Sequence, residues 1–115
     1  MHEYSIVRSL IERVEREARS RGATAVHRIR VRIGELAGVE PALLESAYEL
    51  FRDHTICREA RLEVQSESAE WACPDCQQPI ARGAILRCGE CGTPARLMRG
   101  DAIMLERIEM EVRDV

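Results

Sequence analysis

Four cysteines in the second half of the chain have a spacing that can hold a metal ion. Cys73 and Cys76 form one C-x-x-C pair, and Cys88 and Cys91 form a second pair, with eleven residues between the two pairs. Four thiolates in this pattern favour tetrahedral Zn(II), and a closed shell of four ligands leaves no open position for catalysis. Residues 71–100 contain few large apolar side chains, so the metal must supply their folding free energy. We therefore predict a structural Zn(II) site here.

Other thiol chemistries fit the pattern less well. A redox site needs only one C-x-x-C pair, and iron–sulfur clusters usually show a different spacing. The fifth thiol, Cys57, has no partner at a comparable spacing. It is expected to be a small buried or half-buried hydrophobe.

The charge of residues 71–100 argues against nucleic-acid binding, which needs concentrated positive charge. The segment has four basic and two acidic residues: Arg82, Arg87, Arg96, Arg99, Asp75 and Glu90. Four thiolates with one Zn(II) cancel that excess. No nucleic-acid partner is therefore expected.

The composition indicates one compact domain with a small appendage. The chain has 115 residues, of which 45% are hydrophobic, and one Trp, one Phe and two Tyr, so the core must be aliphatic. No stretch approaches the roughly 20 apolar residues of a membrane span. Charges throughout residues 1–20 argue against a secretory signal. A cytoplasmic location, where thiols stay reduced, is expected.

Two segments have the periodicity of amphipathic helices. The first spans residues 5–21, extends almost to residue 1 and ends at Gly22. Pro41 suits the first turn of the second helix, which is expected to run to about residue 55. The predicted buried residues are Val7, Leu10, Ile11, Val14 and Ala18 in the first helix and Leu43, Leu44, Ala47, Leu50 and Phe51 in the second.

Three further segments alternate as half-buried strands do. Residues 28–33 alternate Arg with Ile or Val, and the arginines are expected on a solvated sheet face. Leu62 and Val64 point one way in the second strand. Near the end of the chain the alternation changes phase between Leu105 and Ile108, which predicts a bulge. The sequence predicts an α+β fold: a small three-stranded sheet with two helices and an inserted zinc-ribbon-like domain.

These features together resemble one family. An initial MHE running into a helix, the segment RIRVRIGELAGVEP and the C-x-x-C…C-x-x-C insert resemble the HypA/HybF hydrogenase-maturation proteins, small metallochaperones that deliver nickel to NiFe hydrogenase. The resemblance covers essentially the whole chain. It implies a nickel site at Met1, His2 and Glu3, with His2 essential. The chain is therefore expected to comprise a nickel-binding α+β domain over residues 1–70 with 101–115, interrupted by a four-cysteine zinc-binding domain over residues 71–100.

The chemistry of the chain start supports nickel. The amine of Met1, the deprotonated amide nitrogen of His2 and its imidazole Nδ1 can close five- and six-membered chelate rings. The amide nitrogen of Glu3 can complete a planar set, which suits Ni(II) or Cu(II) and fits Zn(II) poorly. Without the resemblance, a disordered terminal residue is an equally good interpretation of His2. The side chain of Glu3 alternatively serves only as a favourable charge at the helix start.

The other candidate ligands have simpler interpretations. Glu40, just before Pro41, can cap the second helix or lend a carboxylate to nickel, and capping is preferred. His27 and His54 are expected to be surface residues of a strand and a helix.

The sequence therefore predicts a carrier of Ni(II) that is not an enzyme. The resemblance implies a maturation GTPase and the hydrogenase large subunit as partners. The alternative is a zinc-stapled adaptor that bridges maturation factors without itself carrying nickel.

Overall fold

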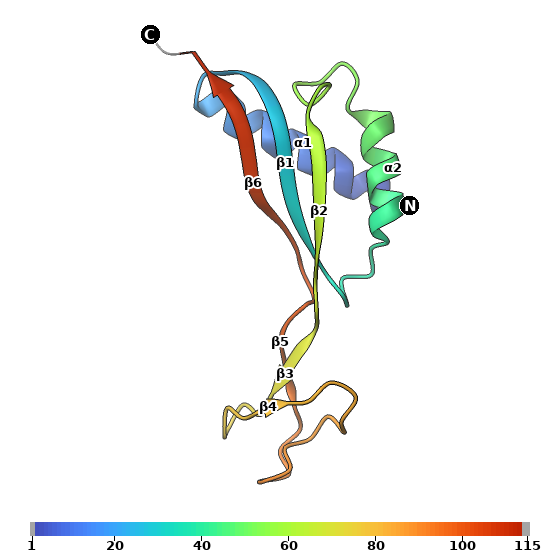
Figure 1. Cartoon of the computed structure of the whole chain (residues 1–115), viewed down its shortest axis with the longest axis vertical. Helices are drawn as coiled ribbons and strands as arrows, with labels where there is room; N and C mark the ends of the chain where they lie inside the picture. Colours follow the sequence, from blue (N-terminus) through green and yellow to red (C-terminus); the bar gives the residue numbers. More distant parts are fainter. Residues whose placement is uncertain (1, 114–115) are drawn as a thin grey trace.

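The computed structural model describes residues 2–113 and, for His2, the backbone alone. The elements follow in the order α1 (His2–Ser20), β1 (Ala23–Gly34), α2 (Pro41–Phe51), β2 (Arg61–Glu67), β3 (Glu70–Ala72), β4 (Pro79–Ile80), β5 (Arg96–Arg99) and β6 (Ile103–Val112). The molecule is elongated, 58 × 34 × 16 Å, with the two helices and the longer strands at one end and β3, β4 and β5 at the other (Figure 1). The predicted α+β architecture is confirmed.

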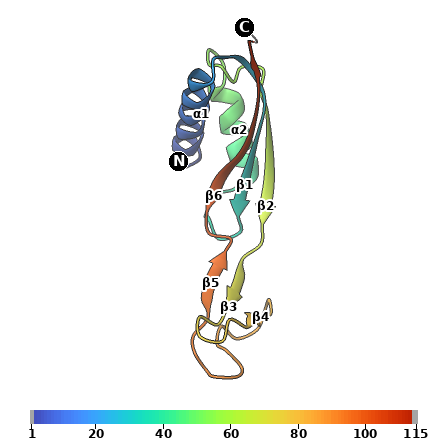
Figure 2. The same ribbon diagram turned by 90° about the vertical axis from the view of Figure 1, so that its left-hand side faces the viewer.

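The main sheet has three strands in the order β2-β1-β6, and both helices lie on one face of it (Figure 2). β1 runs parallel to β2 and antiparallel to β6. Arg30 is opposite Arg107, but the next residue, Val31, is opposite Leu105, so the ladder skips Glu106. This confirms the predicted bulge in the last strand.

The core lies between this sheet and the helices. The whole predicted stripe of α1 is buried, as are Ile29, Val31 and Ile33 of β1. The largest fully buried side chain is Tyr48, which sequence reasoning missed. Its hydroxyl donates a hydrogen bond to the carbonyl oxygen of Ala60 at 2.9 Å, which satisfies the polar group inside an apolar core.

The second helix differs from its prediction in length and in its buried face. It ends at Phe51, and the left-handed conformation of His54, with φ 67°, is incompatible with a helix that continues to residue 55. Leu44, Ala47 and Tyr48 are buried. The predicted core residues Leu43, Leu50 and Phe51 are instead 54%, 67% and 43% exposed. The physical reason is that only one flank of α2 packs against the sheet and α1.

The start of α2 also corrects one prediction. Pro41 lies in the first turn as expected, and Glu40 is the N-cap residue by its backbone conformation. However, its side chain makes no capping hydrogen bond within the described part of the chain. The helix therefore begins because of Pro41 and without help from the Glu40 carboxylate.

The arginines of β1 line the helix-free face of the sheet and pair with acids of both neighbouring strands. Arg28 and Arg30 contact Glu63 of β2 at 3.3 and 3.1 Å. Arg32 pairs with Glu106 of β6, and its hydrogen bond to that carboxylate lowers the pKa of Glu106. The predicted solvated face thus carries a cross-strand network of ion pairs.

Candidate metal centres

The end of the molecule opposite the helices is built around the cysteines. β3 is the central strand of a second sheet in the order β4-β3-β5, and Cys73 directly follows it. The ligand atoms of Cys73, Cys76, Cys88 and Cys91 all lie within 4.8 Å of one another. Cys73 and Cys88 are buried, and Cys76 and Cys91 are exposed. The structure therefore brings together all four thiols that the spacing selected.

The two C-x-x-C pairs form similar turns. In the first, the amide of Cys76 donates to the sulfur of Cys73 at 3.3 Å, and Gln77 closes the turn with φ 61°. In the second, the amide of Glu90 donates to the sulfur of Cys88 at 3.4 Å, and Gly92 closes it with φ 74°. In both turns the backbone offers N–H donors to a sulfur, which stabilises the thiolate form that binds metal.

The sulfur set fits a tetrahedral metal ion. The sulfur of Cys91 lies 3.6 Å from that of Cys73 and 3.4 Å from that of Cys76. Bonds of about 2.3 Å to a tetrahedral Zn(II) would separate two sulfurs by about 3.8 Å. The site is therefore the right size for such an ion with small adjustments.

The clustered thiols also change one another's protonation. The hydroxyl of Thr93, 3.1 Å from the sulfur of Cys91, lowers the pKa of that thiol to about 6. Hydrogen bonds to Cys91 and Cys73 raise the pKa of Cys76 to about 12. Sulfurs this close cannot all ionise unless a cation compensates their charge. Sequence reasoning missed Thr93, which belongs to no cysteine motif.

The cysteine-bearing end is fixed to the main sheet by the turn after β1. Two backbone hydrogen bonds, from Glu35 to Glu67 at 2.8 Å and from Leu36 to Gly100 at 2.7 Å, tie this turn to the strands that lead into and out of the insert. The carboxylate of Glu35 accepts from the amide of Ala69 at 2.8 Å and pairs through both oxygens with Arg82. The hydrogen bond from Arg82 lowers the pKa of Glu35 to about 2.

The start of the chain lies on the helical part, away from the cysteines (Figure 1). α1 begins at His2, and Glu3 is an acid in its first turn. Of the predicted nickel ligands, Met1 and the side chain of His2 lie outside the described residues.

The other two histidines are surface residues, as expected. His27 is on β1, where its Nε2 is 3.2 Å from Glu111. His54 lies in the turn after α2 rather than on the helix, because α2 ends earlier than predicted.

The fold and the four cysteines define a small α+β protein with a four-sulfur site suited to a metal ion. Comparison with known proteins gives the family. Residues 1–110 match the HypA family model, described as hydrogenase/urease nickel incorporation, metallochaperone. The hydrogenase maturation factor HypA of Shewanella oneidensis is 41% identical over 113 residues, which are 96% of each chain. That of Aquifex aeolicus is 36% identical over 97% of this chain and 99% of its own.

Two solved structures of HypA proteins have a fold similar to that of this chain. The solution structure of the Ni metallochaperone HypA from Helicobacter pylori has a TM-score of 0.75 and 31% identity, over 96% of this chain and 98% of its own. A second HypA solution structure has a TM-score of 0.81 and 32% identity, over 98% of both chains. The chain therefore belongs to the HypA family. In addition, neither helix in residues 2–113 is long and apolar enough to cross a bilayer.

Proposed function

We propose that this protein carries Ni(II) at its amino terminus and delivers it during hydrogenase maturation, without catalytic turnover of its own. The observation that carries the proposal is that the match to a nickel-incorporation family begins at residue 1, at the start of α1. The ligands are the amine of Met1, the amide and imidazole nitrogens of His2 and the amide of Glu3. This planar nitrogen set suits Ni(II) better than Zn(II).

The helix start makes such a site compatible with the fold. The first four N–H groups of a helix have no intrahelical acceptor, so metallation there leaves the helical hydrogen bonds intact. The partial positive charge of the helix N-terminus opposes a cation, whereas deprotonated amides make the ligand set anionic. The resulting site holds nickel and can release it, as a donor protein requires.

Within this proposal, Cys73, Cys76, Cys88 and Cys91 hold a structural Zn(II). A set of four thiolates leaves no open coordination position, so zinc supplies folding free energy to residues 71–100 and takes no part in transfer. A maturation GTPase and the hydrogenase large subunit are the partners in the cytoplasm, with no role for nucleic acid or membrane.

The experiment that tests the nickel site changes only the terminal amine. Nickel is titrated into protein with native Met1 and into protein with two extra residues before Met1, while zinc content and helicity are monitored. The extension converts the amine into an amide, so nickel affinity should fall by at least about tenfold. His2→Ala should abolish specific nickel binding, and His27→Ala is the matched control.

Two results would refute this assignment. Equal affinity with and without the extension would show that the amine is not a ligand. Unchanged nickel binding by His2→Ala would leave the adaptor function as the better account of the chain.

A further inference from the structure

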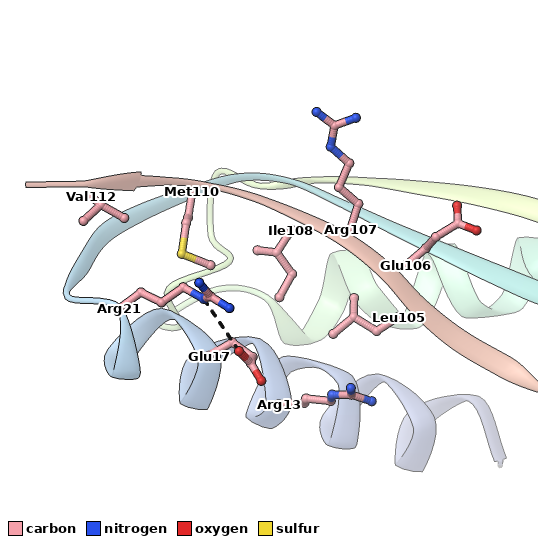
Figure 3. A pocket seen from close by; sticks show the side chains of 9 residues that line it. All are labelled: Arg13, Glu17, Arg21, Leu105, Glu106, Arg107, Ile108, Met110 and Val112. Carbon is pink, nitrogen blue, oxygen red and sulfur yellow. Dashed lines mark ion pairs between the residues drawn. The ribbon is translucent and has the colours of Figure 1, made fainter.

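A groove runs along the outer edge of β6, between this strand and α1 (Figure 3). Two adjoining cavities of about 440 and 360 Å³ form it, and both are lined by Arg13 and Leu105. Leu105, Ile108 and Met110 point from β6 toward the helix (Figure 3). All three remain partly exposed, although they face the helical layer. The groove therefore has an apolar floor that α1 leaves incompletely covered.

The strand beside this groove is an edge strand. In the order β2-β1-β6, β6 pairs with β1 along one edge, and no strand of residues 2–113 pairs with its other edge. An unpaired edge offers backbone N–H and C=O groups to an incoming strand. An extended segment placed there would gain backbone hydrogen bonds and an apolar surface for alternate side chains.

The groove also carries uncompensated positive charge. Its charged lining residues are Arg13, Glu17, Arg21, Glu106 and Arg107. Glu17 is paired with Arg21 at 3.8 Å, and Glu106 is paired with Arg32. Arg13, at the junction of the two cavities, forms no ion pair with any of residues 2–113. Arg107 contacts Glu109 at 3.6 Å, so the unpaired positive charge of the groove is that of Arg13.

We propose that this groove, which we call the β6 groove, binds an extended segment of a partner protein as a fourth strand of the sheet. The segment has apolar side chains toward α1, with one acidic side chain among them that pairs with Arg13. On the opposite face it meets Glu109 and Glu111, whose carboxylates already contact Arg28 at 3.7 Å and His27 at 3.2 Å. Neutral side chains suit that face.

The chemistry of the groove favours another protein over a second copy of this chain. A second β6 would present Leu105, Ile108 and Met110 on its helix-facing side, and none of these can pair with Arg13. One cavity of the groove reaches Ser5 and Ile6 near the start of α1, but Arg13 lies about two helical turns further along, and none of the four cysteines lines the groove. The proposal therefore does not depend on the nickel proposal.

The test uses two synthetic peptides of about eight residues, in which Val and Thr alternate. In one peptide a central Val is replaced by Glu, and in the other by Lys. Fluorescence anisotropy gives their affinities for the wild-type protein, for Arg13→Glu, and for the matched control Arg16→Glu on the same helix outside the groove.

The Glu peptide should bind the wild type and Arg16→Glu equally, and Arg13→Glu roughly tenfold more weakly. The Lys peptide should show the reverse preference and bind Arg13→Glu better than the wild type. Such an exchange of preference reports a direct charge contact, which a loss of fold cannot imitate.

Amide hydrogen exchange locates the bound peptide. The Glu peptide should slow exchange along β6 and leave β2, the other edge strand, unchanged. Exchange slowed at β2 instead, or equal binding of both peptides to the wild type, would overturn the proposal. Failure of the Glu peptide to bind the wild type would also overturn it.

The protein alone is examined for self-association. If sedimentation showed a dimer and hydrogen exchange showed β6 protected in it, the groove would be assigned to a second copy. Nickel affinity of Arg13→Glu should equal that of the wild type in every case.

Discussion

At the scale of single residues, Cys57 shows how burial changes chemistry. The side chain is fully buried, and burial raises the pKa of its thiol to about 11. It belongs to the helix–sheet core, away from the four clustered cysteines. One of the five thiols is thus a core side chain, as its isolated position in the sequence indicated.

Cys57 should make stability fall at alkaline pH. The unfolded thiol ionises near pH 8.5, whereas the folded thiol ionises near 11. A raised folded pKa stabilises the protein below the unfolded pKa, and this stabilisation is lost as the pH rises toward 11. Between about pH 8 and pH 10 the wild type should therefore lose roughly 1–2 kcal/mol more unfolding free energy than Cys57→Ala. Urea denaturation at both pH values measures this, and equal losses would contradict it.

At the scale of elements, most buried faces that depend on hydrophobic periodicity were predicted correctly from the sequence. The buried stripe of α1 and the alternation of β1 follow from spacing alone, and the bulge of β6 follows from a break in spacing. The exposed flank of α2 could not be predicted in this way. Its apolar arc is wider than the sheet and α1 can cover, so which part is buried depends on where α1 lies.

The two flanks of α2 should respond differently to truncation. Leu44 is fully buried, whereas Leu50 is 67% exposed. Leu44→Ala should cost about 2–5 kcal/mol, because it removes packed atoms and leaves a cavity. Leu50→Ala should change stability by less than about 0.5 kcal/mol. Urea unfolding of the two variants makes the comparison, and a large loss in Leu50→Ala would show that this flank is covered in solution.

The cysteine turns were predictable as a ligand set because the spacing itself encodes the knuckles. The groups that support these turns could not be predicted from the spacing. Thr93 reaches the sulfur of Cys91 through turn geometry, and Gln77 occupies a left-handed position that glycine usually fills. Contacts of this kind depend on the three-dimensional path of the backbone in each turn, which the spacing of residues in the sequence does not specify.

Cys73→Ala should separate the two parts of the fold. Three remaining thiolates leave a tetrahedral metal under-coordinated, so zinc should be lost and residues 71–100 should unfold. The helices and the β2-β1-β6 sheet should persist, because their core contains none of the four clustered cysteines. Metal analysis and amide NMR spectra measure both effects, with Cys57→Ala as the control that retains zinc. Full zinc content in Cys73→Ala would contradict the four-thiolate site.

At the scale of the whole molecule, a few contacts hold the two ends in one orientation. The strands that enter and leave the insert pass the turn after β1, where the backbones are in close contact. A Cβ on Gly34 would lie 2.3 Å from the carbonyl carbon of Gly100, so a larger residue could not be accommodated. Sequence reasoning used Glu35 only as part of a family signature. In the structure it joins Ala69 and Arg82 to the main sheet.

The Glu35–Arg82 ion pair should restrain the orientation of the insert more than its stability. The Arg82 side chain is 69% exposed, and exposed ion pairs contribute little to stability and weaken with salt. Arg82→Ala should therefore leave both parts folded and zinc-loaded while widening the range of their relative orientations. Residual dipolar couplings and amide relaxation, which report each part separately, measure this.

The matched control is Arg99→Ala, which removes an exposed pair with Glu70 between β5 and β3 of the second sheet. It should leave the relative orientation unchanged. High salt, at about 1 M, should loosen the wild type toward the Arg82→Ala behaviour because it screens exposed charges. Mild acid should not, since the pKa of Glu35 is lowered to about 2 and its contribution is lost only as the pH falls toward that value. If Arg82→Ala and Arg99→Ala gave the same couplings as the wild type, the backbone hydrogen bonds of Glu35 and Leu36 alone would set the orientation.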